Sequence, residues 1–413
     1  MAYNRKQRLN DNIKAIETAF ILDREQRTPT ARERLLLERY CGFGGLKCIL
    51  NPARELADAV HWAKSDLELF APTVELHRLI RENSKNESEY KQLMDSLKQS
   101  VLTAFYTPSA ITEALTDVLK EHQIIPEKVL EPSAGIGAFV DSVLDNNPKA
   151  DIMAFEKDLL TGKILRHLHP EQKVRIEGFE KIEKPFNDYF DLAISNIPFG
   201  DVAVFDPSYT AMKGMRALVT RRIHNYFFVK ALDTVRDGGL VAFITSQGVL
   251  NAKNNSAARF MMLYHADLVS AIRLPNNLFT ENANTEVGSD LIILQKNSQK
   301  ESLRGDDNLL DTVYNDENRI PTNNYFLEHP ERIIHTTAKL DTDPFGKPAM
   351  IYTHEDGVEG IAEDLRKMLH EDFKKNLNLN RYLGIEETKA EEVKEVEETE
   401  KIEKTEKIKP SIE

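Results

Sequence analysis

The chain carries at residues 129–139 the stretch VLEPSAGIGAF, in which an apolar run ends in Glu131 and is followed by Gly135 and Gly137. This order predicts a buried strand, a tight turn and the start of a helix. Glycines in such a turn let backbone N–H groups approach a ligand, because no Cβ intervenes. A tight turn without a ligand is one alternative. A dinucleotide site is another, although Val140 stands where its fingerprint has a third glycine.

The stretch contains the first of seven short β-branched runs, and helical segments separate the first five. The runs cover residues 128–131, 151–156, 174–177, 190–195, 240–245, 268–274 and 290–295. This alternation predicts an α/β, doubly wound, mostly parallel sheet with helices on both faces. A Pro/Asn-rich loop joins the last two runs, which predicts an antiparallel pair at one end. Glu156 ends the second run, where a carboxylate accepts hydrogen bonds from the ribose of a nucleoside cofactor; a surface charge is the alternative.

Composition and periodicity divide the chain into four regions. Residues 1–100 are expected to be helical at 5–22, 30–40 and 52–69, with breaks at Pro29, at 42–45 and at Pro72, and with a surface helix or connector at 81–100. Residues 101–297 hold the sheet, and 298–385 form a small region that is a candidate for substrate contact. Residues 386–413 contain 11 Glu, 6 Lys and no aromatic residue. They predict a charged, disordered tail, with a partner-binding helix as the alternative.

A second signal, SNIPFG at residues 195–200, ends the fourth run. The Asn196 side chain and the Ile197 carbonyl, held beside Pro198, offer two hydrogen-bond acceptors, and Phe199 offers a stacking face. Together these groups can hold a planar amine, whereas a turn with a packed phenylalanine is the alternative. Upstream, TAFYTP at residues 103–108 precedes a helix expected at 109–119, and helix initiation alone would also explain it.

These three elements, in this order, resemble motifs X, I and IV of the AdoMet-dependent amino-methyltransferases of DNA, which take the forms F-Y/F-T-P, E/D-P-S-A-G-x-G-x-F and N-P-P-Y/F. The order is similar to that of the gamma class of N6-adenine methyltransferases. Ile197 departs from the usual proline, and Gly178-Phe179-Glu180 stands where many relatives have Asp-Phe. The flanking segments resemble the methylase portion of methyltransferase–helicase proteins of phages and conjugative elements; these segments are 40–47, 198–201, 224–228 and 273–279.

The resemblance implies a Rossmann-like class I methyltransferase, AdoMet as cofactor, and methylation of the exocyclic amine of an adenine flipped out of DNA. The implied catalytic residues are Asn196, Ile197, Pro198 and Phe199. The implied cofactor-binding residues are Tyr106, Thr107, Pro108, Glu131, Pro132, Ser133, Ala134, Gly135, Gly137, Phe139, Glu156, Phe179 and Asn196. The implied role is that of a mobile-element methylase in modification or anti-restriction, and no metal is expected.

The formal net charge of -13 argues against polyanion binding by the whole surface, but the charge is unevenly distributed. Residues 207–230, directly after the SNIPFG motif, contain basic residues and no Asp or Glu. Four of these basic side chains are predicted to contact DNA phosphates: Lys213, Arg216, Arg221 and Arg222. A solvated helix face is the alternative.

The two cysteines, Cys41 and Cys48, are too few for a disulfide framework. With no signal-peptide pattern and no apolar run of membrane-span length, they predict a cytoplasmic protein. DNA is the expected partner, together with a separate helicase, since no Walker A sequence is present. Two alternatives stay open, which are a non-catalytic AdoMet- or DNA-binding partner of a helicase, and methylation of RNA or of a protein glutamine.

Overall fold

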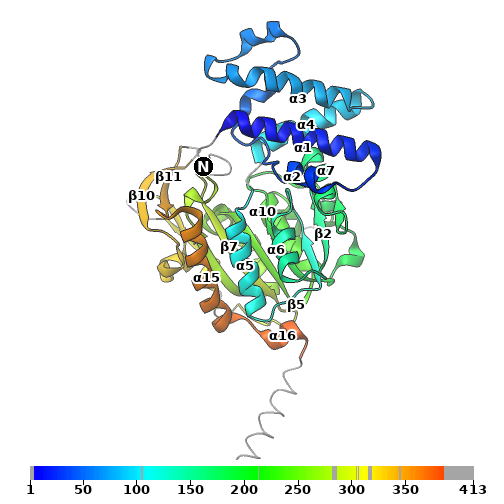
Figure 1. Cartoon of the computed structure of the whole chain (residues 1–413). Helices are drawn as coiled ribbons and strands as arrows, with labels where there is room; N and C mark the ends of the chain where they lie inside the picture. The colour runs from blue at the N-terminus through cyan, green and yellow to red at the C-terminus, as the bar shows by residue number, and fades with distance from the viewer. Residues whose placement is uncertain are drawn as a thin grey trace, which may run out of the picture.

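A computed structural model describes residues 4–103, 106–212, 214–280, 286–303, 305, 307–314, 319–343 and 346–385. Its centre is a seven-stranded sheet in the order β3-β2-β1-β4-β5-β7-β6 (Figure 1). The strands are β1 (Lys128–Glu131), β2 (Asp151–Phe155), β3 (Lys173–Arg175), β4 (Phe190–Asn196), β5 (Val235–Ser246), β6 (Ala266–Leu274) and β7 (Ser289–Lys296). Neighbouring strands are parallel except that β7 runs antiparallel to both β5 and β6. The predicted sheet and its terminal antiparallel pair are confirmed.

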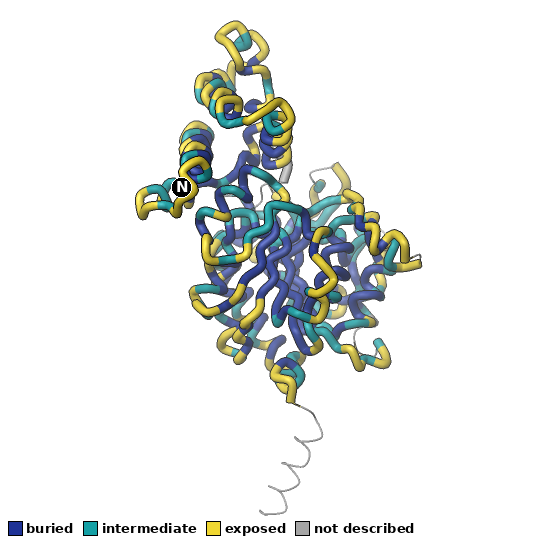
Figure 2. The backbone as a smooth tube through the Cα atoms, turned by 90° about the vertical axis from the view of Figure 1, so that its right-hand side faces the viewer, coloured by how far each residue is buried: buried dark blue, intermediate teal, exposed yellow. Residues whose placement is uncertain are grey.

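Helices cover both faces of this sheet, which Figure 2 shows as a deeply buried part of the chain. One face packs against α5 (Ser109–Glu121), α6 (Ala138–Asn146) and α15 (Gly357–Asn376). The other packs against α10 (Ile223–Thr234) and α12 (Ser256–His265). This strand order with helices on two faces is the class I methyltransferase architecture, so the predicted Rossmann-like fold is confirmed.

The N-terminal region is helical, as predicted, and lies over the β2 side of the sheet (Figure 1). Its helices are α1 (Arg5–Glu25), α2 (Ala31–Leu37), α3 (Phe70–Glu82) and α4 (Glu87–Thr103). They share a third apolar core with α7 (Leu159–Leu168), which follows β2. The region therefore packs directly on the helix that begins beside the predicted cofactor residue Glu156.

Two expectations for this region were wrong in detail, and a third was confirmed. Residues 52–69 form the 3-10 turns η2 (Leu56–His61) and η3 (Lys64–Leu69) instead of a helix. Pro72 lies in the first turn of α3, where a missing backbone N–H breaks no helical hydrogen bond. The surface helix expected within 81–100 is present as α4, and its inner face, with Leu93 and Leu97, lies in the third core.

The remaining elements are short and flank the sheet. They are α8 (Pro207–Thr210), α9 (Met215–Val219), α11 (Gly248–Asn251), α14 (Asn324–Glu328), α16 (Leu379–Leu383), and two hairpins, β8 (Thr312–Tyr314) with β9 (Pro321–Asn323) and β10 (Thr337–Thr342) with β11 (Pro348–Thr353). Residues 386–413, predicted as a tail, lie outside the described residues. Of the helices that are described, none combines the length and the apolar character of a membrane span.

Candidate active site at the carboxyl edge of the sheet

The strand order reverses between β1 and β4, because the chain continues from β1 outward to β2 and from β4 outward to β5. In open α/β sheets, ligands bind at the carboxyl ends of the strands beside such a reversal. Glu131 is the last residue of β1, and Asn196 is the last residue of β4. The fold therefore brings the two strongest sequence signals to one edge.

The glycine turn after β1 requires glycine at two positions. Gly135 and Gly137 have φ angles of +57° and +96°, which side chains rarely adopt. A Cβ at residue 135 would lie 2.8 Å from Tyr106 Cε1, and one at residue 137 would lie 2.5 Å from His169 Nε2. Tyr106, predicted from the upstream motif, thus packs directly on the turn, and His169 supports it from α7. Sequence reasoning missed His169.

Two carboxyl groups border this turn, of which Glu131 is buried and Glu156 is half-buried. Glu156 accepts hydrogen bonds from the backbone N–H groups of Gly135 at 2.8 Å and of Asp158 at 2.7 Å, and Glu131 accepts one from Ser133 at 3.2 Å. Burial raises the pKa of Glu131 to about 8, and burial together with the charge of Asp158 raises the pKa of Glu156 to about 8. Acidic groups beside this turn fit AdoMet, which carries positive charge and ribose hydroxyls.

The N-terminal region contacts the part of the site that would hold the cofactor, here called the cofactor side, through α4. Ser96 donates its hydroxyl to Asp158 Oδ2 at 2.6 Å and accepts the N–H of Leu160 at 3.0 Å. Tyr40 Oη lies 3.3 Å from Thr161 Oγ1. No local sequence signal marks Ser96, since its partners lie more than sixty positions away.

The part of the candidate site that would hold the substrate base, here called the base side, is formed by the ends of β4 and β5. The N–H of Ile197 donates to the carbonyl of Ile244 at 3.0 Å, which extends the ladder between β4 and β5 by one residue. The N-P-P-Y/F motif has a proline at this position, and a proline has no N–H to donate. Ile197 therefore adds a hydrogen bond that holds this peptide in place. The Phe199 ring lies edge-on to that of Phe279, with centroids 6.2 Å apart. Phe279 is fully buried in the first core, so it supports the Phe199 ring from behind, and sequence reasoning gave it no role.

Two residues predicted to bind cofactor lie in the apolar cores instead. Phe139 is buried in α6, and Phe179 is only 1% exposed. The Phe179 ring lies among other aromatic rings, with centroids 5.3 Å from Phe227 and 5.8 Å from Phe155. The short turn η4 (Phe179–Lys181) directs the ring inward, so in this structure it has no open face for stacking on adenine.

The other predicted cofactor residues shape the turns. Thr107 is buried, and Pro108 is the N-cap of α5. Pro132, Ser133 and Ala134 follow Glu131, and the N–H of Ala134 donates to the carbonyl of Phe155 at 2.8 Å. This bond ties the turn after β1 to the end of β2.

The predicted phosphate contacts differ in their surroundings. Arg216 makes a two-pronged ion pair with Asp233, with N–O distances of 2.5 and 2.9 Å. Arg222 lies 3.2 Å from Asp201 and donates to Asn254 at 2.8 Å. Arg221 is exposed, whereas Lys213 lies outside the described residues. Among the residues that the structure covers, no three His, Cys, Asp or Glu side chains form a metal site.

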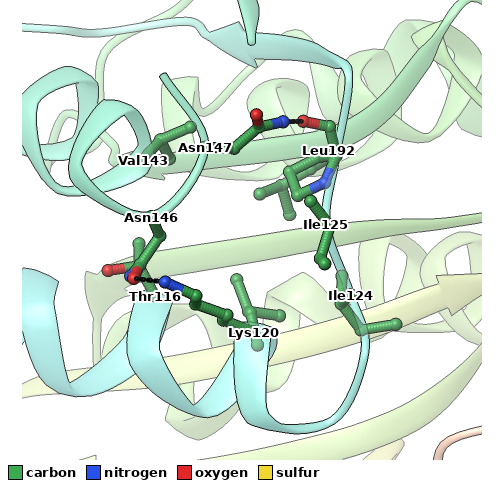
Figure 3. Close-up of a pocket in the computed structure, with 10 residues that line it drawn as sticks. Thr116, Lys120, Ile124, Ile125, Val143, Asn146, Asn147 and Leu192 are labelled. Atoms are coloured by element: carbon green, nitrogen blue, oxygen red, sulfur yellow. Dashed lines mark hydrogen bonds between the residues drawn. The ribbon is translucent and has the colours of Figure 1, made fainter. Parts of the chain in front are cut away.

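Two hollows elsewhere contain none of the motif residues. A cavity of about 10 Å³ lies between α5, α6 and Leu192, toward the amino ends of the strands (Figure 3). It has room for about one water molecule. An open hollow of about 450 Å³ lies between α5 and α15 and is lined largely by acidic side chains.

A family model matches most of the chain, including the elements of this site. The model of the family described as N-6 DNA Methylase matches residues 88–391. The chain belongs to this family. The match takes in β1 to β7, α4 and α15, and so includes both the glycine turn and the end of β4.

Two curated relatives cover shorter parts of the chain. The protein called Defense against restriction protein B, from Escherichia phage P1, is 29% identical over 201 residues, which are 47% of this chain and 8% of the phage protein. Type II methyltransferase M.XamI from Xanthomonas campestris pv. amaranthicola is 25% identical over 173 residues, which are 39% of this chain and 33% of that protein. The chain thus spans a minor part of both.

Solved structures resemble the fold at low sequence identity. The ATP-dependent Type ISP restriction-modification enzyme LlaBIII, solved bound to DNA, matches with a TM-score of 0.41 and 12% identity over 90% of this chain and 28% of its own. The type IIG restriction endonuclease BpuSI matches with a TM-score of 0.39 and 17% identity over 72% of this chain and 38% of its own.

Proposed function

We propose that the chain methylates the N6 amine of adenine in DNA with AdoMet as methyl donor, as part of a modification or anti-restriction system of a mobile element. One observation carries the proposal. Asn196 and the clamped Ile197 peptide lie at the carboxyl end of β4, next to the β1 end that holds Glu131 and the glycine turn. A planar amine held at the first site would thus face a cofactor held at the second.

The cofactor side is proposed to hold AdoMet through its charged and hydroxyl groups. Glu156 accepts hydrogen bonds from the ribose, and Tyr106, Thr107 and Glu131 border the amino acid part of the cofactor, next to the turn from Ser133 to Gly137. When bound, AdoMet supplies an electrophilic methyl group on a sulfonium centre. A bound cation stabilises the ionised forms of Glu131 and Glu156, so its binding is coupled to the release of protons from these groups.

The base side is proposed to orient the amine. The adenine leaves the duplex and stacks on Phe199, whose ring is supported by the buried Phe279. Asn196 Oδ1 and the Ile197 carbonyl accept the two hydrogens of the amine, which directs the nitrogen lone pair toward the methyl group. Pro198 restricts the backbone beside the second acceptor. Alignment and fixed dipoles then carry the reaction without a strong base.

The regional assignments belong to the same proposal. Residues 101–297 form the catalytic unit, 1–100 support it, 298–385 contribute to substrate contact, and 386–413 are a tail. Among the described basic residues, Arg221 is the leading phosphate contact, because Arg216 and Arg222 already pair with protein groups. A separate helicase is the proposed partner.

The test is transfer of labelled methyl from AdoMet to unmethylated DNA, followed by nucleoside analysis. The label is expected in N6-methyladenine. Asn196→Ala should lower kcat by roughly 10²- to 10³-fold with AdoMet affinity changed less than threefold, because it removes an acceptor that aligns the amine. Asn380→Ala, at an exposed position of α16 at the opposite end of the molecule (Figure 1), is the matched control and should leave kcat unchanged. Label in RNA or protein with none in DNA would overturn the substrate assignment.

A further inference from the structure

An exposed apolar patch begins immediately after the catalytic motif. We name it the apolar rim, and it consists of Val202, Phe205, Met212, Met215 and Leu218. Phe205 is 80% exposed and Val202 is 60% exposed. Large apolar side chains usually lie inside a fold, so a group of them beside a candidate active site indicates a surface that is covered when the protein works.

The backbone on both sides of Phe205 is anchored. The N–H of Val204 donates to the carbonyl of Thr220 at 2.8 Å, and the Val204 side chain packs against the second core. Asp206 is buried and accepts hydrogen bonds from the Ser208 N–H at 2.8 Å and from the Tyr226 hydroxyl at 2.7 Å. Since both neighbours are fixed inward, the Phe205 side chain is held outward by the local geometry.

The rim also lies within reach of the base site. Phe205 follows Phe199 by six residues, and a fully extended chain of that length spans about 20 Å at most. The ion pair between Asp201 and Arg222, at 3.2 Å, holds the start of this segment against the beginning of α10. An aromatic ring projecting from such a segment is close enough to meet a duplex whose adenine occupies the base site.

The charges around the rim favour a polyanion as the occupant. Each acidic group of the segment is compensated within the protein: Asp201 by Arg222, Asp206 by Lys230 and Asp233 by Arg216. Arg221 remains exposed at the end of the rim. Apolar side chains beside an exposed cation suit the stacked bases and phosphates of DNA better than an acidic or purely apolar protein surface.

We infer that Phe205 is a duplex wedge, which inserts into the space left by the flipped adenine and stacks on the neighbouring bases. This inference rests on the proposed function and adds a residue to it. Flipping a base removes its stacking and pairing, and an aromatic ring that fills the gap recovers part of the lost stacking. The wedge therefore matters where the target adenine is paired and becomes dispensable where it is already unpaired.

The test compares methylation of two substrates by wild type and Phe205→Ala. On a fully paired duplex, the variant should lose roughly tenfold to a hundredfold in kcat/KM, the range expected for loss of one base–aromatic stack. On the same sequence with the target adenine mispaired or single-stranded, the loss should stay below about threefold. Phe205→Trp, which keeps an aromatic ring, should restore the duplex rate. Leu56→Ala removes an 87% exposed side chain from the distant N-terminal region and is the matched control.

A second measurement separates the wedge from the proposed chemistry. With 2-aminopurine in place of the target adenine, wild type should raise the fluorescence as the base leaves the stack, and Phe205→Ala should raise it less, whether or not methyl transfer occurs. Absence of methylation by wild type would contradict the proposed function alone. Equal losses on paired and unpaired substrates, no loss on either, or an unchanged fluorescence response would overturn the wedge and point to a protein partner for the rim.

Discussion

The cofactor half of the site, at the ends of β1 and β2, is held by hydrogen bonds between buried groups, whereas the base half, around residues 197–222, turns apolar side chains to solvent. Gly135, Glu156, Asp158 and Ser96 form a connected chain of contacts in the first half. Phe205 extends from an anchored backbone in the second. The proposed function accounts for the contrast, because a small cofactor binds well to a pre-formed site, whereas a duplex must approach and deform.

Among single substitutions that would break the comparison, the largest effect is expected from Ser96→Ala. The substitution leaves Asp158 Oδ2 without its 2.6 Å donor and loosens the turn whose N–H holds Glu156. We expect the AdoMet dissociation constant to rise roughly five- to tenfold, measured by calorimetry, with the KM for DNA unchanged and Ser96→Thr restoring affinity.

The control for that prediction is Ser100→Ala, one turn further along α4. The Ser100 hydroxyl oxygen accepts the N–H of Phe43 at 3.2 Å, so its loss affects contacts within the N-terminal region. Both variants should lower the free energy of unfolding by about 1–3 kcal/mol. If both also weaken AdoMet binding equally, Ser96 has only a structural role.

The pH dependence of AdoMet binding tests the cofactor half of the comparison without a substitution, and the size of the effect depends on the pH range that is measured. Because Glu131 and Glu156 have pKa values of about 8 and AdoMet favours their ionised forms, binding should release protons. Affinity should rise by up to about tenfold per proton and pH unit from pH 6 and level off above 8. Glu156→Gln should reduce this slope, and a slope unchanged in the variant would show that Glu156 does not titrate on binding.

The same raised pKa values predict that the free energy of unfolding of the ligand-free protein changes with pH in the direction opposite to AdoMet affinity. A carboxyl whose pKa is raised in the folded state binds its proton more tightly there than in the unfolded chain. The free energy of unfolding should therefore fall between about pH 4.5 and 8, by up to about 1.4 kcal/mol per pH unit for each group. Denaturant titrations at several pH values check this sign.

The smallest expected effect concerns the base half, where substitutions of Arg221 and Arg216 should have different consequences. Arg221→Ala should weaken duplex binding about two- to fivefold and reduce the salt-dependence slope by about 1, because one phosphate contact is lost. Arg216→Ala breaks the pair with Asp233 and should instead lower the free energy of unfolding by about 1–2 kcal/mol. The reverse pattern would show that Arg216 exchanges Asp233 for phosphate in the complex.

Much of the fold was predictable because its signals are local. The seven strands lie close to their predicted positions, since short β-branched runs bounded by turns mark them. Predictions were wrong where local structure or the burial of a side chain depends on contacts with residues far away in the chain. Phe179 was predicted to bind the cofactor, yet it packs among Phe155 and Phe227, and residues 52–69, expected as a helix, form two 3-10 turns.

By itself, the sequence determined the class of sheet, the glycine turn, and the identity of Asn196, Ile197 and Phe199 at the end of one strand, because these depend on neighbours along the chain. Only the tertiary structure decided that Ser96 from α4 holds Asp158, that Phe279 meets Phe199, and that Phe205 is left outside. The physical reason is that contacts between groups many residues apart, and the exposure of a side chain, are set by how the helices and the sheet pack together.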